Sequence, residues 1–383
     1  MFHRAKELAK TLFIRLCSCI PVQKNHIVFY VHQKQGLCGN PKYIMLYLHE
    51  HIPGVFRFYW ASSYPHTVEN EDWFTVLRHG SLRYFFVLTT ARVVITDDGI
   101  NGSHQKRRGQ LYISTWHGGG TFKKVGFDTA HDEGQLRYLN EFYRGLDYMV
   151  VSCKRQAELY QTAFRLLPEQ MVASGMPRTD ILFTKTENRE RQTDIVLRVR
   201  KAFSIPEGAH LLLYAPTYRK DRYALLEPHA LEQVLAALSA MFGGEWVCLY
   251  RTHYLGTKFK MHGKAVHDAT NWPDVEELEL ASEVLVTDYS SVLWDMSLMK
   301  KLCLLYVPDT ETYIANNRDF FEPFSAYPYP KASNLRELVR AIEHFEKEPY
   351  DGAVQRYLSR CGCLDDGKST ERFCRWLMAV IET

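Results

Sequence analysis

The feature that most constrains the fold of this chain is a regular alternation of strand-like and helix-like segments. Short runs rich in β-branched and aromatic residues are separated by stretches with the three-and-four apolar spacing of a helix. This alternation is typical of βαβ units, in which helices cover both faces of a parallel sheet. In the first half we expect strands at 26–31, 56–62, 93–96, 111–116, 148–152 and 172–174. The helices expected between them include 41–51, 81–89 and 154–166.

The same alternation starts again in the second half. A charge-dense stretch at 185–200 carries no strand signal and predicts a linking helix. Further strands are expected at 210–215, 245–250, 284–287 and 302–307. Further helices are expected at 228–242, 275–281, 292–299, 334–346 and 369–381. The 383 residues therefore predict an α/β protein with two Rossmann-like halves.

We expect this organisation to give three parts. An amphipathic segment at 1–24 precedes a Rossmann-like domain at 25–190 and a second one at 200–383. The last helix can pack back on the first of these domains. Ligands of such sheets bind at the carboxyl ends of the strands, so the default site is the cleft between the two halves.

Composition excludes several classes of protein. The chain has 47 Lys and Arg against 44 Asp and Glu, a net charge of +3, which argues against a dedicated nucleic-acid binder. A hydrophobic fraction of 46% excludes wholesale disorder. The nine cysteines include no CxxC pair, which favours reduced thiols in a cytosolic protein and no metal site.

The N-terminal segment is unusually basic. No stretch of the chain reaches the roughly 18 uninterrupted apolar residues that span a bilayer. Residues 1–24 carry five cations and one acid, and Arg15 interrupts the apolar centre that a signal peptide needs. The apolar side chains share one helical face: Ala5, Leu8, Ala9, Leu12, Phe13, Leu16 and Ile20. An ordinary packed helix and a helix lying on an anionic membrane both fit, and the basic polar face favours the membrane for residues 1–20.

A hydroxyl-rich turn follows the expected strand at 284–287. Its residues are Asp288, Tyr289, Ser290 and Ser291, and a helix follows them. Free backbone N–H groups, two hydroxyls and a helix dipole at one point favour a bound phosphate. The alternative is plain N-capping, which needs only one of the serines.

A second motif follows the expected strand at 111–116. His117 precedes three glycines, Gly118–Gly119–Gly120, and two lysines, Lys123 and Lys124, follow. Consecutive glycines indicate a backbone held close to a ligand. An imidazole there suits a general base, and the lysines suit an anionic substrate, although a histidine at a strand end can also be purely structural. Neither a Walker loop nor a GxGxxG fingerprint is present.

Two more strand ends in the second half carry hydroxyls and cations. Thr217 and Arg219 follow one strand, and Arg251 and His253 follow the next. Arginine binds two phosphate oxygens at once, so these ends together with the serine turn predict a diphosphate pocket. No acid occurs at 99–127 or at 246–267, so each half offers an electropositive stretch beside its motif.

Taken in order, these motifs resemble those of the CDP-glycerol glycerophosphotransferases, the teichoic-acid primases and polymerases of bacterial cell-wall synthesis. The matching segments are 116–124, 126–128, 175–180, 215–219, 251–253, 287–291 and 366–372. The resemblance implies a GT-B fold, peripheral attachment at the cytoplasmic face of the cell membrane, and transfer of an alditol phosphate from a CDP-activated donor. The family pattern has a proline soon after the glycine, where this chain reads Gly118–Gly119–Gly120, and another after the Arg-x-His element, where this chain has Tyr254.

The resemblance and the strand-end motifs together give the expected residue roles. His117 and His253 are expected to be catalytic, with His117 as the base. The donor diphosphate is expected to bind Arg251, His253, Ser290, Ser291, Asp288, Thr217 and Arg219. The acceptor is expected to bind Gly118, Gly119, Lys123 and Lys124. No cofactor is expected, and no protein-held metal either, because the chain lacks an Asp-x-Asp element.

The expected reaction moves glycerol phosphate from CDP-glycerol to a hydroxyl of a lipid-linked saccharide, of the undecaprenyl type, or of a polyol-phosphate acceptor, and releases CMP. The chain length favours a primase or single-addition enzyme. One alternative keeps the fold and uses CDP-ribitol or a nucleotide sugar as donor. Another is a non-catalytic nucleotide-binding scaffold on the membrane surface.

Overall fold

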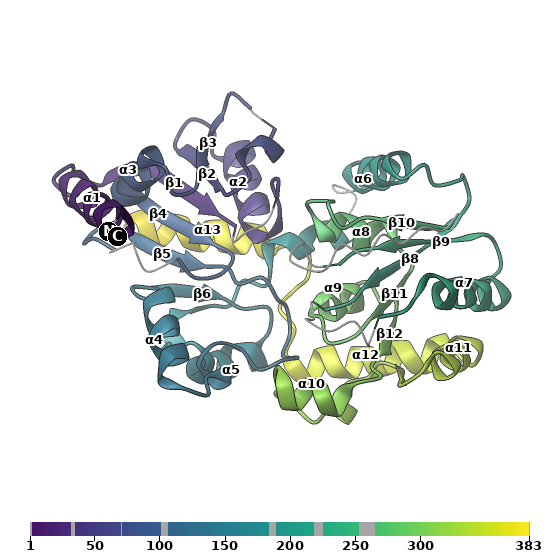
Figure 1. Ribbon diagram of the computed structural model, residues 1–383. Helices are drawn as coiled ribbons and strands as arrows, with labels where there is room; N and C mark the ends of the chain where they lie inside the picture. The colour runs from purple at the N-terminus through teal and green to yellow at the C-terminus, as the bar shows by residue number, and fades with distance from the viewer. Residues whose placement is uncertain are drawn as a thin grey trace.

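The computed structural model describes residues 2–31, 35–69, 71–100, 106–183, 189–217, 225–252 and 265–382. These residues form two parallel sheets, of seven and six strands, each flanked by helices (Figure 1). The α/β architecture predicted from the sequence is therefore confirmed.

The first sheet has the strand order β3-β2-β1-β4-β5-β6-β7. All neighbouring strands are parallel. The strands are β1 Gln23–Tyr30, β2 Arg57–Ser62, β3 Phe74–Arg78, β4 Ala91–Thr96, β5 Leu111–Ser114, β6 Tyr148–Val150 and β7 Met171–Val172.

Helices cover both faces of this sheet. They are α1 Phe2–Cys17, α2 Gly39–His51, α3 Leu82–Thr90, α4 Glu133–Phe142, α5 Lys154–Ala163 and α13 Ser369–Glu382. Successive side chains of a strand point to opposite faces. Strand β1 accordingly sends Ile27 and Phe29 into a core shared with α2 and α13, and Val28 and Tyr30 into a core shared with α3 and α5.

The second sheet has the order β10-β9-β8-β11-β12-β13, again with parallel neighbours. The strands are β8 His210–Ala215, β9 Trp246–Tyr250, β10 Val266–Asp268, β11 Val284–Thr287, β12 Leu302–Tyr306 and β13 Lys331–Ala332. Leu211, Leu212 and Leu213 are all fully buried. An uninterrupted apolar strand of this kind is typical of a parallel sheet covered on both faces.

The helices of the second half are α6 Arg189–Ala202, α7 Pro228–Phe242, α8 Val275–Ala281, α9 Val292–Leu298, α10 Thr310–Asn316, α11 Leu335–Glu343 and α12 Lys347–Cys361. Short 3-10 helices are η1 Pro65–Thr67, η2 Gly126–Thr129, η3 Pro168–Gln170, η4 Pro177–Leu182 and η6 Phe324–Ala326. The single helix expected at 334–346 ends early, and α12 follows it separately. Pro349 is the third residue of α12, a first-turn position where proline removes no helical hydrogen bond.

The last helix, α13, returns to the first sheet (Figure 1, yellow). It contacts α2 and η4, and its side chains Phe373, Cys374 and Leu377 are buried in the core of the first sheet. The chain thus crosses between the two halves before α6 and again after α12. Nowhere in the described ranges is a helix long and apolar enough to cross a membrane.

Candidate active site

A cavity of about 650 Å³ lies between the carboxyl ends of the two sheets. The segments that follow β5, β8, β9, β10 and β11 line it. Parallel sheets commonly bind ligands at this edge, and the volume is in the range of small-molecule sites.

A strained turn after β5 presents His117 to the cavity. Trp116 has a φ of 53°, which is uncommon for a residue with a bulky side chain. Asn40 on α2 holds the turn, because its Nδ2 donates to the carbonyl oxygens of Thr115, at 3.1 Å, and Trp116, at 2.9 Å. His117 is exposed and lines the cavity.

The surroundings of the His117 ring suit a base. Its Nδ1 lies 3.1 Å from the carbonyl oxygen of Asp97. A carbonyl oxygen can only accept, so Nδ1 carries the proton and the neutral ring keeps its lone pair at Nε2. The Trp116 ring packs on the imidazole at a centroid distance of 4.3 Å.

The glycine run allows the second half of the molecule to approach closely. A Cβ at Gly119 would lie 2.2 Å from Trp294 on α9, and one at Gly120, whose φ is +68°, would lie 2.3 Å from the same ring. A Cβ at Gly118 would lie 3.1 Å from the Ser291 Oγ. We expected these glycines to face a ligand. All three line the cavity, but at Gly119 and Gly120 the packing of Trp294 also excludes a side chain.

The two lysines after the glycines have different surroundings. Lys123 lines the cavity, with its Nζ 6.0 Å from the ring centre of Tyr313. Lys124 is not among the lining residues, and its Nζ pairs with the Asp319 carboxylate at 2.7 Å. The two segments also pair through their backbones, since the Lys124 N–H donates to the Asp319 carbonyl at 2.9 Å.

On the other wall, Arg251 follows β9. Its backbone N–H donates to the Tyr214 carbonyl at 2.9 Å, and its guanidinium donates to the carbonyl oxygen of Trp272. Burial lowers the pKa of Arg251, and the nearby Glu276 opposes this. Because an arginine stays charged even with a lowered pKa, it offers the cavity a fixed positive charge.

Asp288 organises this wall through its neighbours. Its Oδ1 accepts from the backbone N–H of Thr217 at 2.8 Å, from the Thr217 hydroxyl at 2.5 Å and from the Tyr289 N–H at 2.5 Å. These bonds join the ends of β8 and β11. Thr217 lines the cavity and Asp288 does not, so the carboxylate acts on the site by fixing the threonine.

The serine turn does not cap α9. Ser291 precedes the helix with helical dihedral angles and no side-chain cap bond, and Ser290 Oγ accepts only a long bond, 3.5 Å, from Val292. Both serines line the cavity. The simple capping alternative therefore does not describe this turn. Because α9 has only seven residues, the hydroxyls matter more for an anion than the dipole does.

Two expected residues, Arg219 and His253, lie outside the described residues, as does Tyr254. The cavity also has lining residues that sequence reasoning missed. They lie after β10 and at or after the end of α10, and comprise Thr270, Asn271, Trp272, Asn316, Asn317 and Arg318. Both elements are short and were not expected, so no strand or helix end drew attention to these positions.

The cavity has the electrostatics of an anion site. Lys123, Arg251 and Arg318 contribute cations, and Glu276 is the one acid among the described lining residues. Burial, followed by the charge of Asp274, raises the pKa of Glu276 to about 8. Glu276 is also paired with Arg178, so it adds little negative potential.

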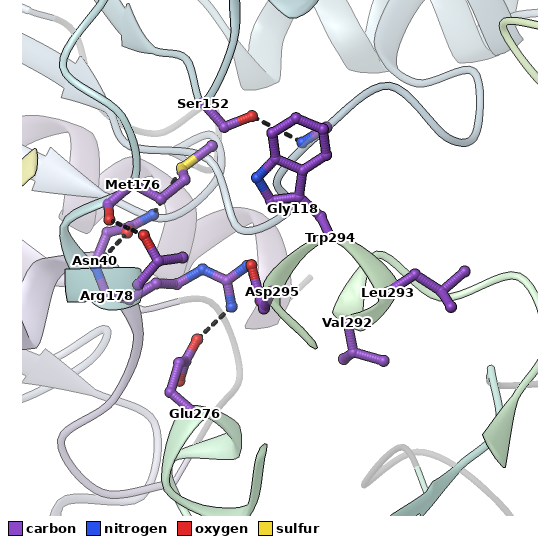
Figure 2. Close-up of polar contacts among 12 residues, drawn as sticks. Asn40, Gly118, Ser152, Met176, Arg178, Glu276, Val292, Leu293, Trp294 and Asp295 are labelled. Atoms are coloured by element: carbon purple, nitrogen blue, oxygen red, sulfur yellow. Dashed lines mark hydrogen bonds and ion pairs between the residues drawn. The ribbon is translucent and has the colours of Figure 1, made fainter. Parts of the chain in front are cut away.

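Buried ion pairs join the two halves beside the cavity. Figure 2 shows Arg178, on η4, extended toward Glu276 on α8 and Asp295 on α9. Lys42 on α2 binds Asp274 at 2.5 Å. Together with Trp294, these contacts fix how the two cavity walls face each other.

Comparison with known proteins agrees with this picture. Residues 12–379 match the family of CDP-Glycerol:Poly(glycerophosphate) glycerophosphotransferases. A teichoic acid poly(glycerol phosphate) polymerase of Bacillus spizizenii is 26% identical, over 96% of this chain and 95% of that protein. A teichoic acid glycerol-phosphate transferase of Staphylococcus aureus is also 26% identical, over 94% of both. Because the first of these is a polymerase of similar length, chain length does not separate primases from polymerases.

The solved structure of the wall teichoic acid polymerase TagF superposes with a TM-score of 0.84. It is 24% identical and covers all of this chain and 96% of the TagF chain. This likeness confirms the expected GT-B type of fold, with two sheets facing a central cleft.

Proposed function

The chain belongs to this glycerophosphotransferase family, and we propose that it transfers glycerol phosphate from CDP-glycerol to a hydroxyl of a membrane-linked saccharide or polyol-phosphate acceptor. The observation that carries the proposal is the shared cavity, in which His117 on one wall is opposed by Arg251, Ser290 and Ser291 on the other. This arrangement combines a base with an anion site, which is what a diphosphate donor and a hydroxyl nucleophile require.

In the proposed reaction, the acceptor hydroxyl attacks the β-phosphorus of CDP-glycerol. His117 Nε2 takes the hydroxyl proton as the new oxygen–phosphorus bond forms. The bond between the β-phosphorus and the bridging oxygen breaks, and CMP leaves with the electron pair. Most of the rate enhancement in such a transfer comes from positioning and from neutralising the phosphoryl charge.

The donor side is assigned to the second half of the chain. Arg251, Ser290, Ser291 and Thr217 line the wall on which a diphosphate binds, with Asp288 fixing Thr217. His253 and Arg219 complete this proposed set, and His253 serves in addition as a second catalytic group. Charge-assisted bonds from such donors are stronger than neutral ones.

The acceptor side is assigned to the first half. Gly118 and Gly119 line the cavity with His117, and the Lys123 ammonium suits a phosphate carried by the acceptor. Lys124, which pairs with Asp319, contributes to the acceptor site mainly by holding the segment of Lys123 in place.

A donor panel tests the function. CMP release is measured with CDP-glycerol, CDP-ribitol and a nucleotide sugar, each with a lipid-linked disaccharide acceptor. We expect CMP release from CDP-glycerol that depends on the acceptor. A preference for CDP-ribitol or for a nucleotide sugar would support the second donor hypothesis. Donor binding without any CMP release would support the scaffold hypothesis.

Substitution of the base sharpens this test. His117→Ala is expected to lose at least about a hundredfold in turnover while its donor affinity, measured by calorimetry, is retained. His131→Ala is the matched control, because His131 is exposed and does not line the cavity. Full turnover by His117→Ala would remove His117 from the mechanism.

We also propose that the protein attaches to an anionic membrane surface at the cytoplasmic face of the cell membrane. Supporting this, α1 packs against α3 while Leu8, Leu12 and Leu16 remain 72%, 59% and 62% exposed. Leu82 and Phe86 on α3 are exposed as well. An apolar stripe within a basic segment is the composition of an interfacial helix.

A further inference from the structure

The segment that follows β4 contacts the proposed base and also carries a carboxylate. Strands β4 and β5 are parallel neighbours that pair Thr96 with Ser114, so the segments that follow them leave the sheet side by side. Asp97 and Asp98 follow β4, and His117 follows β5. The peptide group that joins Asp97 to Asp98 places its carbonyl oxygen 3.1 Å from the His117 Nδ1.

The Asp98 side chain is fixed in place. Its Oδ1 accepts from the Tyr143 hydroxyl at 2.9 Å and from the Gly99 N–H at 3.0 Å. Tyr143 directly follows α4 and packs against Phe164 at a centroid distance of 5.0 Å, so this donor is itself held. Two donors on one carboxylate oxygen favour the ionised form.

We propose that Asp98 is a positioning residue for His117: its carboxylate, fixed by Tyr143 and Gly99, stabilises the imidazolium that forms when His117 takes the acceptor proton. The inference rests on the proposed function, in which His117 is the base. Asp98 does not take up the proton, which stays on His117 Nε2 while CMP leaves. The carbonyl oxygen of Asp97 sets the tautomer of His117.

The electrostatics agree with this geometry. Burial raises the pKa of Asp98, and the charge of His117 lowers it. The coupling is reciprocal, so the Asp98 charge favours the protonated form of His117. Among the described residues, the other ionisable groups near Asp98 include Asp97, Tyr112, Tyr138, Tyr143 and Tyr160.

Burial raises the pKa of each of these four tyrosines, so they stay neutral at working pH. In the cavity, Lys123 and Arg251 add positive charge on the open side of His117. A cationic cavity disfavours a further cation, so a base there needs a nearby negative charge. Asp98, one residue beyond the carbonyl group that contacts His117, supplies it.

The test is a pH profile of kcat for Asp98→Asn, measured with CDP-glycerol and a soluble acceptor. Without the negative charge the imidazolium is less stable, so His117 loses its proton at lower pH and is a weaker base. We expect kcat to fall about tenfold and the acidic limb to move down by about one pH unit. KM for the donor is expected to change by no more than about twofold. The acidic limb of Asp98→Glu should lie closer to that of the unmodified protein than the limb of Asp98→Asn does.

Two further variants separate this role from a structural one. Asp147→Asn is the matched control, since Asp147 accepts from the Tyr112 N–H, at 2.8 Å, at the opposite end of β5. Its profile should superpose on that of the unmodified protein. Tyr143→Phe keeps the carboxylate but removes a donor, and should shift the limb in the same direction by a smaller amount, which keeps the inference testable if Asp98→Asn does not fold.

The outcomes are distinct. An unchanged limb in folded Asp98→Asn, with His117→Ala inactive, overturns this inference and leaves the proposed function standing. Full activity of His117→Ala overturns the assignment of the base itself. A direct reading comes from NMR of the His117 ring, whose titration midpoint should fall in Asp98→Asn and stay in place in Asp147→Asn.

Discussion

Gly119 is where the loop bearing His117 touches the second half of the molecule. Its Cβ position lies 2.2 Å from Trp294, whose Nε1–H donates to Asp365 at 2.7 Å. Gly119→Ala must therefore displace a buried indole. We expect a loss of about 1–3 kcal/mol in the free energy of unfolding, measured by denaturant titration, and reduced kcat because the cavity walls move.

Gly352→Ala provides the control for this substitution. Gly352 lies in α12, and a Cβ there meets only the flexible Arg356 side chain, at 3.3 Å. That variant should be as stable as the unmodified protein or slightly more stable. In a Trp294→Leu background, Gly119→Ala should lower the free energy of unfolding by less, because the two residues are in contact. Equal stability of Gly119→Ala and the unmodified protein would contradict the steric argument.

The buried side chain of Glu279 makes the stability of the fold depend on pH. It is fully buried on α8, and neither of its carboxylate oxygens has a hydrogen-bond partner among the described residues. Burial, with the charges of Asp295 and Glu276, raises its pKa well above the usual value. The folded protein therefore holds a proton that the unfolded chain releases above roughly pH 4.5, so this residue destabilises the fold increasingly as pH rises.

Glu279→Gln removes this penalty. We expect the free energy of unfolding of the variant, relative to that of the unmodified protein, to increase between pH 5 and pH 8 by at most about 1.4 kcal/mol per pH unit. Denaturant titrations at several pH values measure the difference. Glu343→Gln, at an exposed position on α11, should show no such trend. A gain that is independent of pH would mean that Glu279 is ionised in the fold.

At this scale the sequence predicted where His117, Arg251 and the two serines lie, because strand ends can be recognised from local patterns. It did not predict their partners. Asn40 and Asp365 are distant in sequence from the residues they bind. Such contacts depend on the packing of whole elements, which leaves no local pattern.

At the scale of elements, a substitution in α13 tests how much this helix contributes to the core of the first sheet. The side chain of Leu377, on α13, is fully buried in a core to which α2 also contributes. Leu377→Ala is expected to cost about 2–5 kcal/mol in unfolding free energy, measured by thermal or denaturant unfolding. The matched control is Leu197→Ala on α6, where the side chain is 59% exposed, and there the change should stay within about 0.5 kcal/mol. A small effect at Leu377 would show that α13 is dispensable for this core.

The strands that the sequence missed have a common cause. The strands β3, β10 and β13 lie at or next to the sheet edges and have five residues or fewer. Short edge strands bury little surface and carry weak patterns. The central strands β8 and β11 were predicted with their observed bounds, because both of their faces are buried and their sequences are almost continuously apolar.

At the scale of the molecule, charge separates into regions with different roles. Residues 1–24 hold five cations and one acid, so they account for the net charge of +3, and the rest of the chain is nearly neutral. Within the described part of the body, each acid-free stretch contributes one cation to the cavity, Lys123 and Arg251, and Arg318 adds a third from outside both stretches. Composition gave the total charge, but only the fold shows which of these charges face the cavity.

The basic segment leads to the last prediction. Leu8, Leu12 and Leu16 recur every four residues of α1 and are exposed, whereas Cys17 is buried against the body. Replacing all three leucines by serine removes apolar surface that no other part of the described protein covers. We expect binding to vesicles containing anionic lipid to fall at least about tenfold in a sedimentation assay, because each leucine contributes about 1.5–3 kcal/mol when buried. Activity on a soluble acceptor should persist.

Leu197→Ser controls for the loss of an exposed leucine, since Leu197 lies on α6 of the other half with a similar exposed fraction, 59%. It should bind vesicles like the unmodified protein. Raising the salt concentration should weaken binding of the unmodified protein, because dissolved ions screen the attraction between the cations of the segment and the anionic lipid headgroups. If the triple variant binds anionic vesicles normally, α1 is an ordinary surface helix and the cavity must reach a lipid-linked acceptor in another way.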